Sequence, residues 1–419
     1  MADVFYYKTA FISISLLLST FFIIKCKSKK HSILILIISF IQNFLSFFFF
    51  VNKDFPYFHP LLYFYLHGVW YIFVYCTLFT PKLRSFPYKL FISWTAAWYT
   101  GFAFLGIPFI PLSYIFNTNI LLIIASIIAF ISLIQSLFCF SFGEIVYVDL
   151  ANKKHYEIPT RIDTNFKENI KLNNLTDTTS KYLRVFQMTD VHIGSFISID
   201  RVNNLCNKIL TLNPDLVLLT GDFYTVETRN DDDAFIKAFE PLKKLKGKVF
   251  SCLGNHDYEQ LDAITNGFKE IGIELLDGSD CIVETRLGKV QILGSPFFFN
   301  DSKNMTVELY NRYPRKSECI LHITLMHNPQ CTYNIPDNAT DLTFCGHFHG
   351  GQVGLLAFGI NFSFMSLINL CRKSTNKLMD NGLWGFKKNR IYSHRGTGYY
   401  GLPLRMGIPS EESLMLISF

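Results

Sequence analysis

Long apolar runs fill the first third of this chain, and polar residues become frequent only after it. Phe, Ile, Leu and Tyr dominate through residue 142, whereas Asp, Asn, Lys and Gly return after about residue 150. Crossing the hydrocarbon core of a bilayer takes about 20 mostly apolar residues in a helix, because lipid cannot hydrogen-bond to the backbone. Five stretches approach or meet this requirement: residues 9–24, 32–51, 61–80, 90–110 and 120–140.

This pattern predicts an all-α transmembrane bundle over residues 1–142. Four spans are the alternative, because Gly101, Gly106 and Pro108 weaken the fourth stretch. The first stretch also resembles a signal peptide in its position, but four lysines follow it between residues 25 and 30 instead of small residues suited to cleavage. An uncleaved anchor is therefore favoured.

Basic residues alternate between the short loops that join the predicted spans. The first loop has four lysines, the second has Lys53 alone, the third has three basic residues, and the fourth has none. The positive-inside rule then places the first and third loops in the cytoplasm, and with five spans the segment after residue 140 lies there too. Seven cysteines after residue 143, without CxxC or framework spacing, agree with a reducing compartment. We predict a multi-pass membrane protein with its polar part on the cytoplasmic side.

Beyond a polar connector at residues 143–181, in which we expect one short strand near 144–148, apolar runs of strand length stop abruptly at polar residues. LRVFQMT ends at Asp190, DLVLLT at Gly221 and Asp222, KVFSCL at Gly254 and Asn255, ILHITLM at His327, and DLTFC at Gly346 and His347. In layered α/β folds the loops that leave the carboxyl ends of strands gather at one edge. These polar clusters should therefore converge.

The residue types in the clusters are those that a pair of divalent metal ions needs, namely imidazole nitrogens and carboxylate oxygens. Taken singly, Asp190 or Asp222 could cap a helix, and His347 with His349 could lie on a surface. Helix caps and turns would not explain why all of these clusters occur in one chain and each at the end of a predicted strand. A single structural zinc is disfavoured because no cysteine lies among them. We expect His-x-His on an extended segment, with both imidazoles on one face.

The series DVHIG, GD, GNH, a lone His and GHFHGGQ resembles the calcineurin-like metallophosphoesterase family over about residues 183–419. The Gly194 and GGQ extensions and the C-terminal RGTGYYGLPLRMGIPSEESLMLISF are similar to those family members that carry transmembrane helices. The resemblance implies an α/β domain at residues 182–419, with two mixed β-sheets sandwiched between helices. It also implies two divalent cations, for which Mn, Fe, Zn and Mg are all suitable.

Carried onto this sequence, the resemblance implies a complete set of ligands. One metal would take Asp190, His192, Asp222 and His349, and the other would take Asp222, Asn255, His327 and His347. His256 matches the histidine that assists the leaving group. Arg395 could hold substrate phosphate through its bidentate fork, with a structural salt bridge as the alternative. The segment between Gln352 and Ile391 is longer and more apolar than expected, which leaves the substrate open.

These observations predict a membrane-anchored phosphoesterase that hydrolyses a phosphomonoester or phosphodiester with a hydroxide that bridges the two metals. A lipid-linked phosphoester is the first candidate substrate, and soluble nucleotides or phosphoproteins are the alternative. A transporter or scaffold with an inert domain is the third possibility. Nucleic acid is not expected, since the net charge of +6 includes no arginine-rich helix. Residues 355–371, followed by basic residues, could form an interfacial lid or an internal helix.

Overall fold

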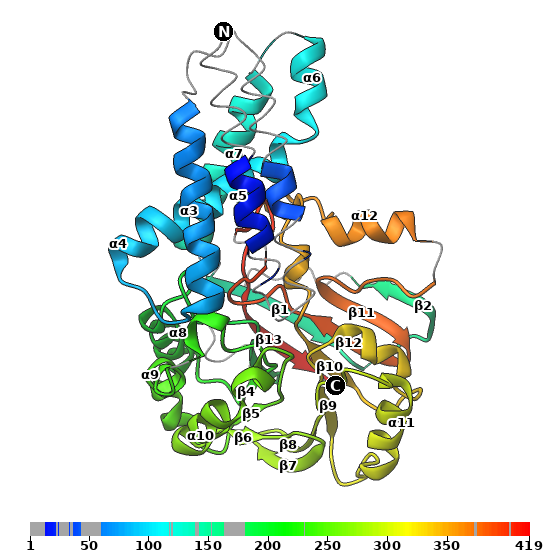
Figure 1. The fold of residues 1–419 in the computed structure, drawn as a ribbon. Coiled ribbons are helices and arrows are strands. Elements are labelled where there is room, and N and C mark those ends of the chain that lie inside the picture. Colours follow the sequence, from blue (N-terminus) through cyan, green and yellow to red (C-terminus); the bar gives the residue numbers. More distant parts are fainter. Residues whose placement is uncertain are drawn as a thin grey trace. The chain divides into compact units, whose positions relative to one another are not determined.

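The computed structural model describes residues 60–116, 118, 120–138, 142–151, 153–162, 181–229, 231–372, 375–401 and 404–419, with the pieces 13–21, 24, 33 and 37–42 before them. The chain divides into two compact units, whose elements are drawn in Figure 1. The helical unit comprises Met1–Phe138 and Gly401–Met406, and the α/β unit comprises Cys139–Tyr400 and Gly407–Phe419.

The helical unit is built around closely packed helices with small residues at their contacts. Its described elements are α3 (Pro60–Phe79), α4 (Phe86–Tyr88), the π-helical segment η1 (Lys89–Trp94), α5 (Thr95–Gly106), α6 (Phe109–Ile115) and α7 (Ile120–Phe138). A Cβ on Gly101 of α5 would lie 2.2 Å from the side chain of Leu404. The backbone N–H of Arg405 donates to Ser136 Oγ of α7 at 2.8 Å. The late segment 401–406 is therefore part of this unit.

Among the described helices, one is long and apolar enough to cross a membrane, namely α7, and Tyr65–Phe79 is apolar but shorter. The predicted span 90–110 runs through η1 and α5 and is interrupted before α6, because Pro108 cannot continue the hydrogen-bond ladder of a helix. The predicted spans 9–24 and 32–51 lie largely outside the described residues. The multi-pass bundle is thus not supported by the described helices. A single, partly buried apolar helix also fits the core of a soluble protein.

The α/β unit contains two mixed sheets, as predicted. The first has the order β1 (Phe142–Asp149), β13 (Glu412–Ser418), β3 (Leu183–Met188), β4 (Leu216–Leu219), β5 (Val249–Ser251) and β6 (Glu274–Leu275). The second has the order β2 (Tyr156–Arg161), β11 (Gly382–Lys387), β12 (Asn389–Ser393), β10 (Leu342–Cys345), β9 (Leu321–Leu325), β8 (Gly288–Gly294) and β7 (Ser279–Thr285). Strands β3 to β6 run parallel to one another, as do β8, β9, β10 and β12.

The inner faces of the two sheets share one hydrophobic core, which includes Val185 and Leu218 from the first sheet and Ile323 and Phe344 from the second. Helices α8 (Ile199–Leu212), α9 (Ala234–Phe239) and α10 (Leu261–Ile271) contribute to the core on the other face of the first sheet. Helix α11 (Ser302–Arg312) and the 3₁₀ segment η6 (Pro329–Asn334) do the same for the second sheet (Figure 1). The central strands are buried on both faces, which explains their continuous apolar sequences.

The segment predicted as a connector contributes strands to both sheets. The strand expected near residues 144–148 is β1, which is longer and pairs with β13. A second strand, β2, was not predicted and pairs with β11 at the edge of the other sheet. Most side chains of β2 are at least partly exposed, so its sequence lacks the apolar run that identifies central strands. Residues 163–180 lie outside the described part of the chain.

Candidate metal centre

The loops at the carboxyl ends of five strands supply the clustered polar side chains. Asp190 follows β3, Asp222 follows β4, Asn255 follows β5, His327 follows β9 and His347 follows β10. Two groups of three residues place their ligand atoms within 4.8 Å of one another. They are Asp190, His192 and His349, and Asp222, His327 and His347. The expected convergence of these loops is therefore present.

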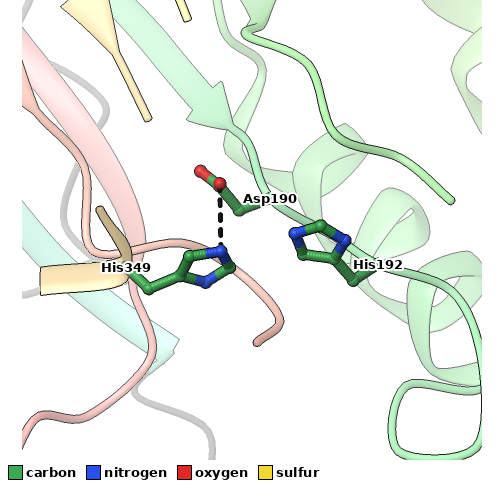
Figure 2. A group of neighbouring side chains, drawn as sticks. All are labelled: Asp190, His192 and His349. Carbon is green, nitrogen blue, oxygen red and sulfur yellow. Dashed lines mark ion pairs between the residues drawn. The ribbon is translucent and has the colours of Figure 1, made fainter. Parts of the chain in front are cut away.

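Figure 2 shows the first group, in which Asp190 and His192 come from one segment and His349 approaches from another. His349 Nε2 lies 3.2 Å from Asp190 Oδ1. Asp222 connects this group to the second one, because its Oδ2 lies 3.7 Å from His192 Nε2 and 3.1 Å from His327 Nε2. A carboxylate in this position can be shared by two cations, as the sequence resemblance implies for Asp222.

The backbone at the clustered residues is unusual. Five of them have positive φ angles: Asp190 (52°), His192 (50°), Asp222 (58°), His347 (74°) and His349 (51°). Residues other than glycine rarely adopt this region, although Asp and His are enriched there, and each instance costs about 1–3 kcal/mol. Neither aspartate is a helix cap, because the helical segments that follow them begin at Ile199 and Val226 and are capped by Ser198 and Thr225. Such strain concentrates where a function requires a fixed side-chain direction.

The expectation of an extended His-x-His segment was wrong. Both His347 and His349 have positive φ angles, and His349 begins the short 3₁₀ segment η7 (His349–Gly351). The backbone therefore turns between the two residues and sends one imidazole to each group of ligands. Glycines on either side of the pair conceal this turn in the sequence, because glycine accommodates both extended and left-handed conformations.

Asp257 ties two of the loops together. Its carboxylate accepts hydrogen bonds from the backbone N–H groups of Asp222 (2.7 Å), Phe223 (2.8 Å) and Gly254 (2.8 Å). A Cβ on Gly254 would lie 2.2 Å from Asp222 Oδ1, so the two loops approach more closely than a side chain would allow. Asn255 follows this contact directly. Asp257 thus positions the loops after β4 and β5 without belonging to either ligand group.

Hydrogen bonds to carbonyl groups orient two of the histidines. His192 Nδ1 lies 3.2 Å from the Tyr224 carbonyl oxygen, and His327 Nδ1 lies 2.6 Å from that of Thr220. A carbonyl oxygen only accepts, so each Nδ1 carries a proton, and Nε2 is the ring nitrogen left to face the ligand groups, which is the arrangement typical of metal-ligating histidines. His192 Nε2 and Asn255 Oδ1 are buried and form no hydrogen bond with the described residues. These donors fit divalent metal ions.

The electrostatics of the site also favour added positive charge. Burial raises the pKa of Asp190 to about 6 and lowers the pKa values of His192 and His347 to about 3 and about 4. Burial acts against a charged His327 as well, but the adjacent Asp222 carboxylate outweighs it and raises the pKa of His327 to about 10. Two buried carboxylates are thus accompanied by few positive charges, and divalent cations would supply the rest.

Comparison with known proteins agrees with this geometry. Residues 183–351 match the family model for calcineurin-like phosphoesterases, a range that contains all seven proposed metal ligands. The α/β unit belongs to this family.

Relatives of this phosphoesterase unit come from bacteria and animals. An uncharacterized metallophosphoesterase of Helicobacter pylori is 26% identical over 238 residues, which cover 56% of this chain and 60% of the relative. Phosphodiesterase YaeI of Escherichia coli is 27% identical over 227 residues, covering 53% and 77%. The transmembrane protein with metallophosphoesterase domain of Danio rerio is 28% identical over 249 residues, covering 55% and 52%. The chain spans about 60% of the length of the Helicobacter relative.

His256 lies beside the phosphoesterase ligands but belongs to neither group. Its backbone N–H donates to Asp222 Oδ1 at 2.9 Å, and its ring centre lies 5.4 Å from that of His192. The side chain is 26% exposed, and its Nδ1 lies 3.7 Å from Glu259 Oε1. Burial acts to lower the pKa of His256, but the interactions with Glu259 and Asp222 outweigh it and raise this pKa. The ring is therefore accessible and able to hold a proton.

The C-terminal RGTGYYG motif adds a contact that sequence reasoning missed. The backbone N–H groups of Thr397 and Gly398 donate to the carbonyl oxygens of Thr189 and Asp190, each at 2.9 Å. A Cβ on Gly398 would lie 2.0 Å from the Val191 carbonyl oxygen, so only glycine allows this approach. The nearby Tyr400 ring stacks on His192 at 4.9 Å and 18°, and meets the His256 ring edge-on at 4.8 Å. The two glycines of the motif, Gly396 and Gly398, were the feature of the sequence that could have indicated this close approach of two backbone segments.

Replacing Tyr400 should test whether its ring holds His192 in place. We expect Tyr400→Leu to reduce metal affinity or turnover about 10-fold to 100-fold, the usual effect of losing a residue that orients a ligand. Tyr400→Phe keeps the stacked ring and should resemble the wild type. Titration of bound Mn²⁺ by the full chain, alongside turnover, measures both effects. A leucine variant with unchanged metal affinity and turnover would contradict a positioning role.

Arg395 is held by protein groups in the structure. Its Nε donates to the Pro409 carbonyl oxygen at 3.2 Å and lies 3.7 Å from Glu411 Oε2, and its side chain is 11% exposed. The structural ion pair considered from the sequence is therefore present. Binding of substrate phosphate by Arg395 stays a prediction.

Proposed function

We propose that the α/β unit is a metal-dependent phosphoesterase that hydrolyses a phosphomonoester or a phosphodiester. The observation that carries this proposal is the position of Asp222 between two groups of His and Asp ligand atoms. Family membership supports the same reaction class. The name of the Escherichia coli relative, a phosphodiesterase, favours diesters.

In this proposal, Asp190, His192, Asp222 and His349 hold one divalent cation, and Asp222, Asn255, His327 and His347 hold the other. Two such cations, when bound, lower the pKa of water and neutralise charge on the phosphoryl oxygens. The protein contributes fixed ligand directions, through the carbonyl groups of Thr220 and Tyr224 and the carboxylate of Asp257. His256 donates a proton to the departing oxygen, since its ring is the accessible imidazole beside the ligands.

We further propose that the chain is anchored in a membrane and that its phosphoesterase unit faces the cytoplasm. Helix α7 supports the anchor, since it has the length and composition of a membrane span. The alternating basic loops favour the cytoplasmic side on condition that the chain has the five spans predicted from the sequence. A lipid-linked phosphoester is then the favoured substrate. Soluble nucleotides or phosphoproteins would use the same ligands, so only substrate profiling separates these classes.

Metal removal tests the reaction class directly. The full chain, purified in detergent, should contain two divalent metal ions and hydrolyse a chromogenic phosphodiester. Treatment with a chelator should abolish turnover, and Mn²⁺ should restore it. The reason is that, in this proposal, the bound cations lower the pKa of the water that attacks the phosphoester. Metal analysis and absorbance assays measure both properties on one preparation. A folded chain that binds no metal and stays inactive with added Mn²⁺ would contradict the proposal.

A further inference from the structure

The segment between the ligand His349 and strand β11 carries an exposed apolar surface. It contains the short 3₁₀ segment η8 (Leu356–Phe358) and helix α12 (Phe364–Cys371), and no residue of α12 is buried. Six large apolar side chains are exposed: Leu355 (41%), Phe358 (76%), Ile360 (54%), Phe364 (50%), Leu367 (45%) and Leu370 (76%). The three that belong to α12 recur at intervals of three residues and therefore share one side of the helix. We call these six residues the α12 surface.

The α12 surface is held outward by specific contacts. Ser363 caps the helix through a reciprocal hydrogen-bond pair with Ser366, and its Oγ also donates to the buried Asp380. Asn369 bonds both backbone groups of Leu378, with its Oδ1 accepting at 2.7 Å and its Nδ2 donating at 3.0 Å. The polar side of α12 is thus attached to the unit and the apolar side is left exposed. This arrangement contradicts the alternative of an internal helix packed on the sheets.

The same helix is anchored directly beside the metal centre. Gly351 ends the segment that begins at His349, and a Cβ there would lie only 3.2 Å from Met365 Cγ of α12. The backbone N–H of Phe364 donates to the Val353 carbonyl oxygen at 2.8 Å. Figure 1 shows α12 at the margin of the α/β unit, outside the two sheets. Whatever covers the α12 surface therefore lies next to the loop that carries His349.

Charge indicates what this partner is. No Asp or Glu occurs from Gln352 to Met379, whereas Arg372, Lys373 and Lys377 follow the apolar residues. An apolar helix face with a basic flank is typical of helices that lie in the interface of an anionic membrane. A second copy of this chain is disfavoured, because a symmetric contact would bring the same positive charges together. If α7 spans a membrane, as its length and composition allow, the chain that carries α12 is attached to a bilayer.

We propose that the α12 surface lies in the headgroup region of an anionic membrane and that the substrate of the adjacent metal centre is a lipid phosphoester. The inference rests on the proposed phosphoesterase function and names its substrate class. The apolar side chains enter the boundary between headgroups and acyl chains, and the basic residues bind lipid phosphates. A phosphoester at the level of the headgroups then needs no extraction into water to reach the loop at His349.

The native thiol of Cys371 reports on this surface, because it is exposed and directly follows Leu370. The full chain is labelled with an environment-sensitive nitrobenzoxadiazole maleimide. A Cys371→Ser chain labelled in the same way gives the fluorescence of label on the other cysteines, which is subtracted from the signal of the wild type. The labelled chain is placed in nanodiscs of equal parts phosphatidylcholine and phosphatidylglycerol, in nanodiscs of phosphatidylcholine alone, and in lipid-free amphipol. We expect blue-shifted emission in anionic nanodiscs and quenching by lipids spin-labelled near the headgroup, with smaller effects in phosphatidylcholine and neither effect in amphipol.

Matched variants separate charge from background. Arg372→Gln with Lys377→Gln should weaken the quenching in anionic nanodiscs, whereas Lys269→Gln with Lys303→Gln, two exposed lysines on other helices, should leave it unchanged. Absence of lipid quenching in both nanodiscs would overturn the inference. So would emission that is already blue-shifted in amphipol, since protein would then cover the surface.

A second assay distinguishes failure of the inference from failure of the proposed function. Each labelled preparation is also tested for hydrolysis of a soluble chromogenic diester, which needs the metal centre but no membrane contact. Retained hydrolysis without lipid quenching refutes only membrane docking. Loss of hydrolysis and of bound metal in the unlabelled wild type refutes the phosphoesterase function on which the inference rests.

Discussion

Asp222→Asn is expected to lower phosphodiester turnover about 1000-fold or more and to reduce the metal content of the full chain. Metal ions contribute several kcal/mol to stabilising the transition state, and a loss of about 4 kcal/mol corresponds to about 1000-fold in rate. Asp222 is the carboxylate that lies within reach of both ligand groups. The amide that replaces it carries no charge and has one oxygen, so it cannot be shared by two cations in the same way.

The choice of asparagine keeps the loop intact. Its Oδ1 can still accept the hydrogen bond from the His256 backbone N–H, and the backbone N–H at position 222 can still donate to Asp257. Asp262→Asn, on the exposed side of α10, is the matched control and should behave as the wild type. Turnover and metal analysis on both variants measure the effect. A fully active Asp222→Asn chain with its normal metal content would show that the bridging assignment is wrong.

The position of the candidate site could be predicted from the sequence because it depends on local patterns. Each central strand is an apolar run that stops at a polar residue, and the topology of layered α/β folds then brings those ends together. Asp190, Asp222 and His327 were found in this way without knowledge of strand order. Their pairing into two groups, however, came from the family resemblance, because spacing along the chain does not specify distances between loops.

The features that sequence analysis missed depend on contacts between distant segments. Tyr400 meets His192 across more than two hundred residues of chain, and no periodicity marks such a contact. Strand β2 was missed because edge strands are mostly exposed. The fourth apolar stretch was read as one span because hydropathy averages over Pro108, whereas the backbone ends a helix there. Apolar composition predicts burial or lipid contact more reliably than it predicts helix length.

The metal centre also depends on the contact between the two sheets. Thr220, at the end of β4 in the first sheet, accepts the hydrogen bond that orients His327 of the second sheet. Gln187 of β3 reinforces this junction, since its Nε2 donates to Thr220 Oγ1 at 2.9 Å and to the Cys345 carbonyl oxygen at 3.0 Å. Each sheet supplies ligands that the other one orients. The strained backbone at the ligands is thus held by a core that includes both sheets.

His256→Ala is expected to reduce turnover about 100-fold to 10,000-fold for substrates with poor leaving groups, while the metal content stays at the wild-type level. The ring lies outside both ligand groups, so its removal should leave metal binding intact. The alkoxide that leaves an alkyl phosphodiester is strongly basic and needs a proton, whereas nitrophenolate is weakly basic and leaves readily without one. The rate loss should therefore be large for an alkyl ester and much smaller for a nitrophenyl ester, measured on the same preparation.

Glu259→Gln provides a graded comparison. Glu259 Oε1 lies 3.7 Å from His256 Nδ1, and its carboxylate is also paired with Arg229. The glutamine keeps the size of the side chain but removes the charge that favours a protonated ring, so we expect a smaller loss with the same dependence on leaving group. Equal losses for both esters in His256→Ala would contradict proton donation, because a proton donor matters in proportion to the basicity of the departing oxygen. Loss of metal instead would make His256 a ligand.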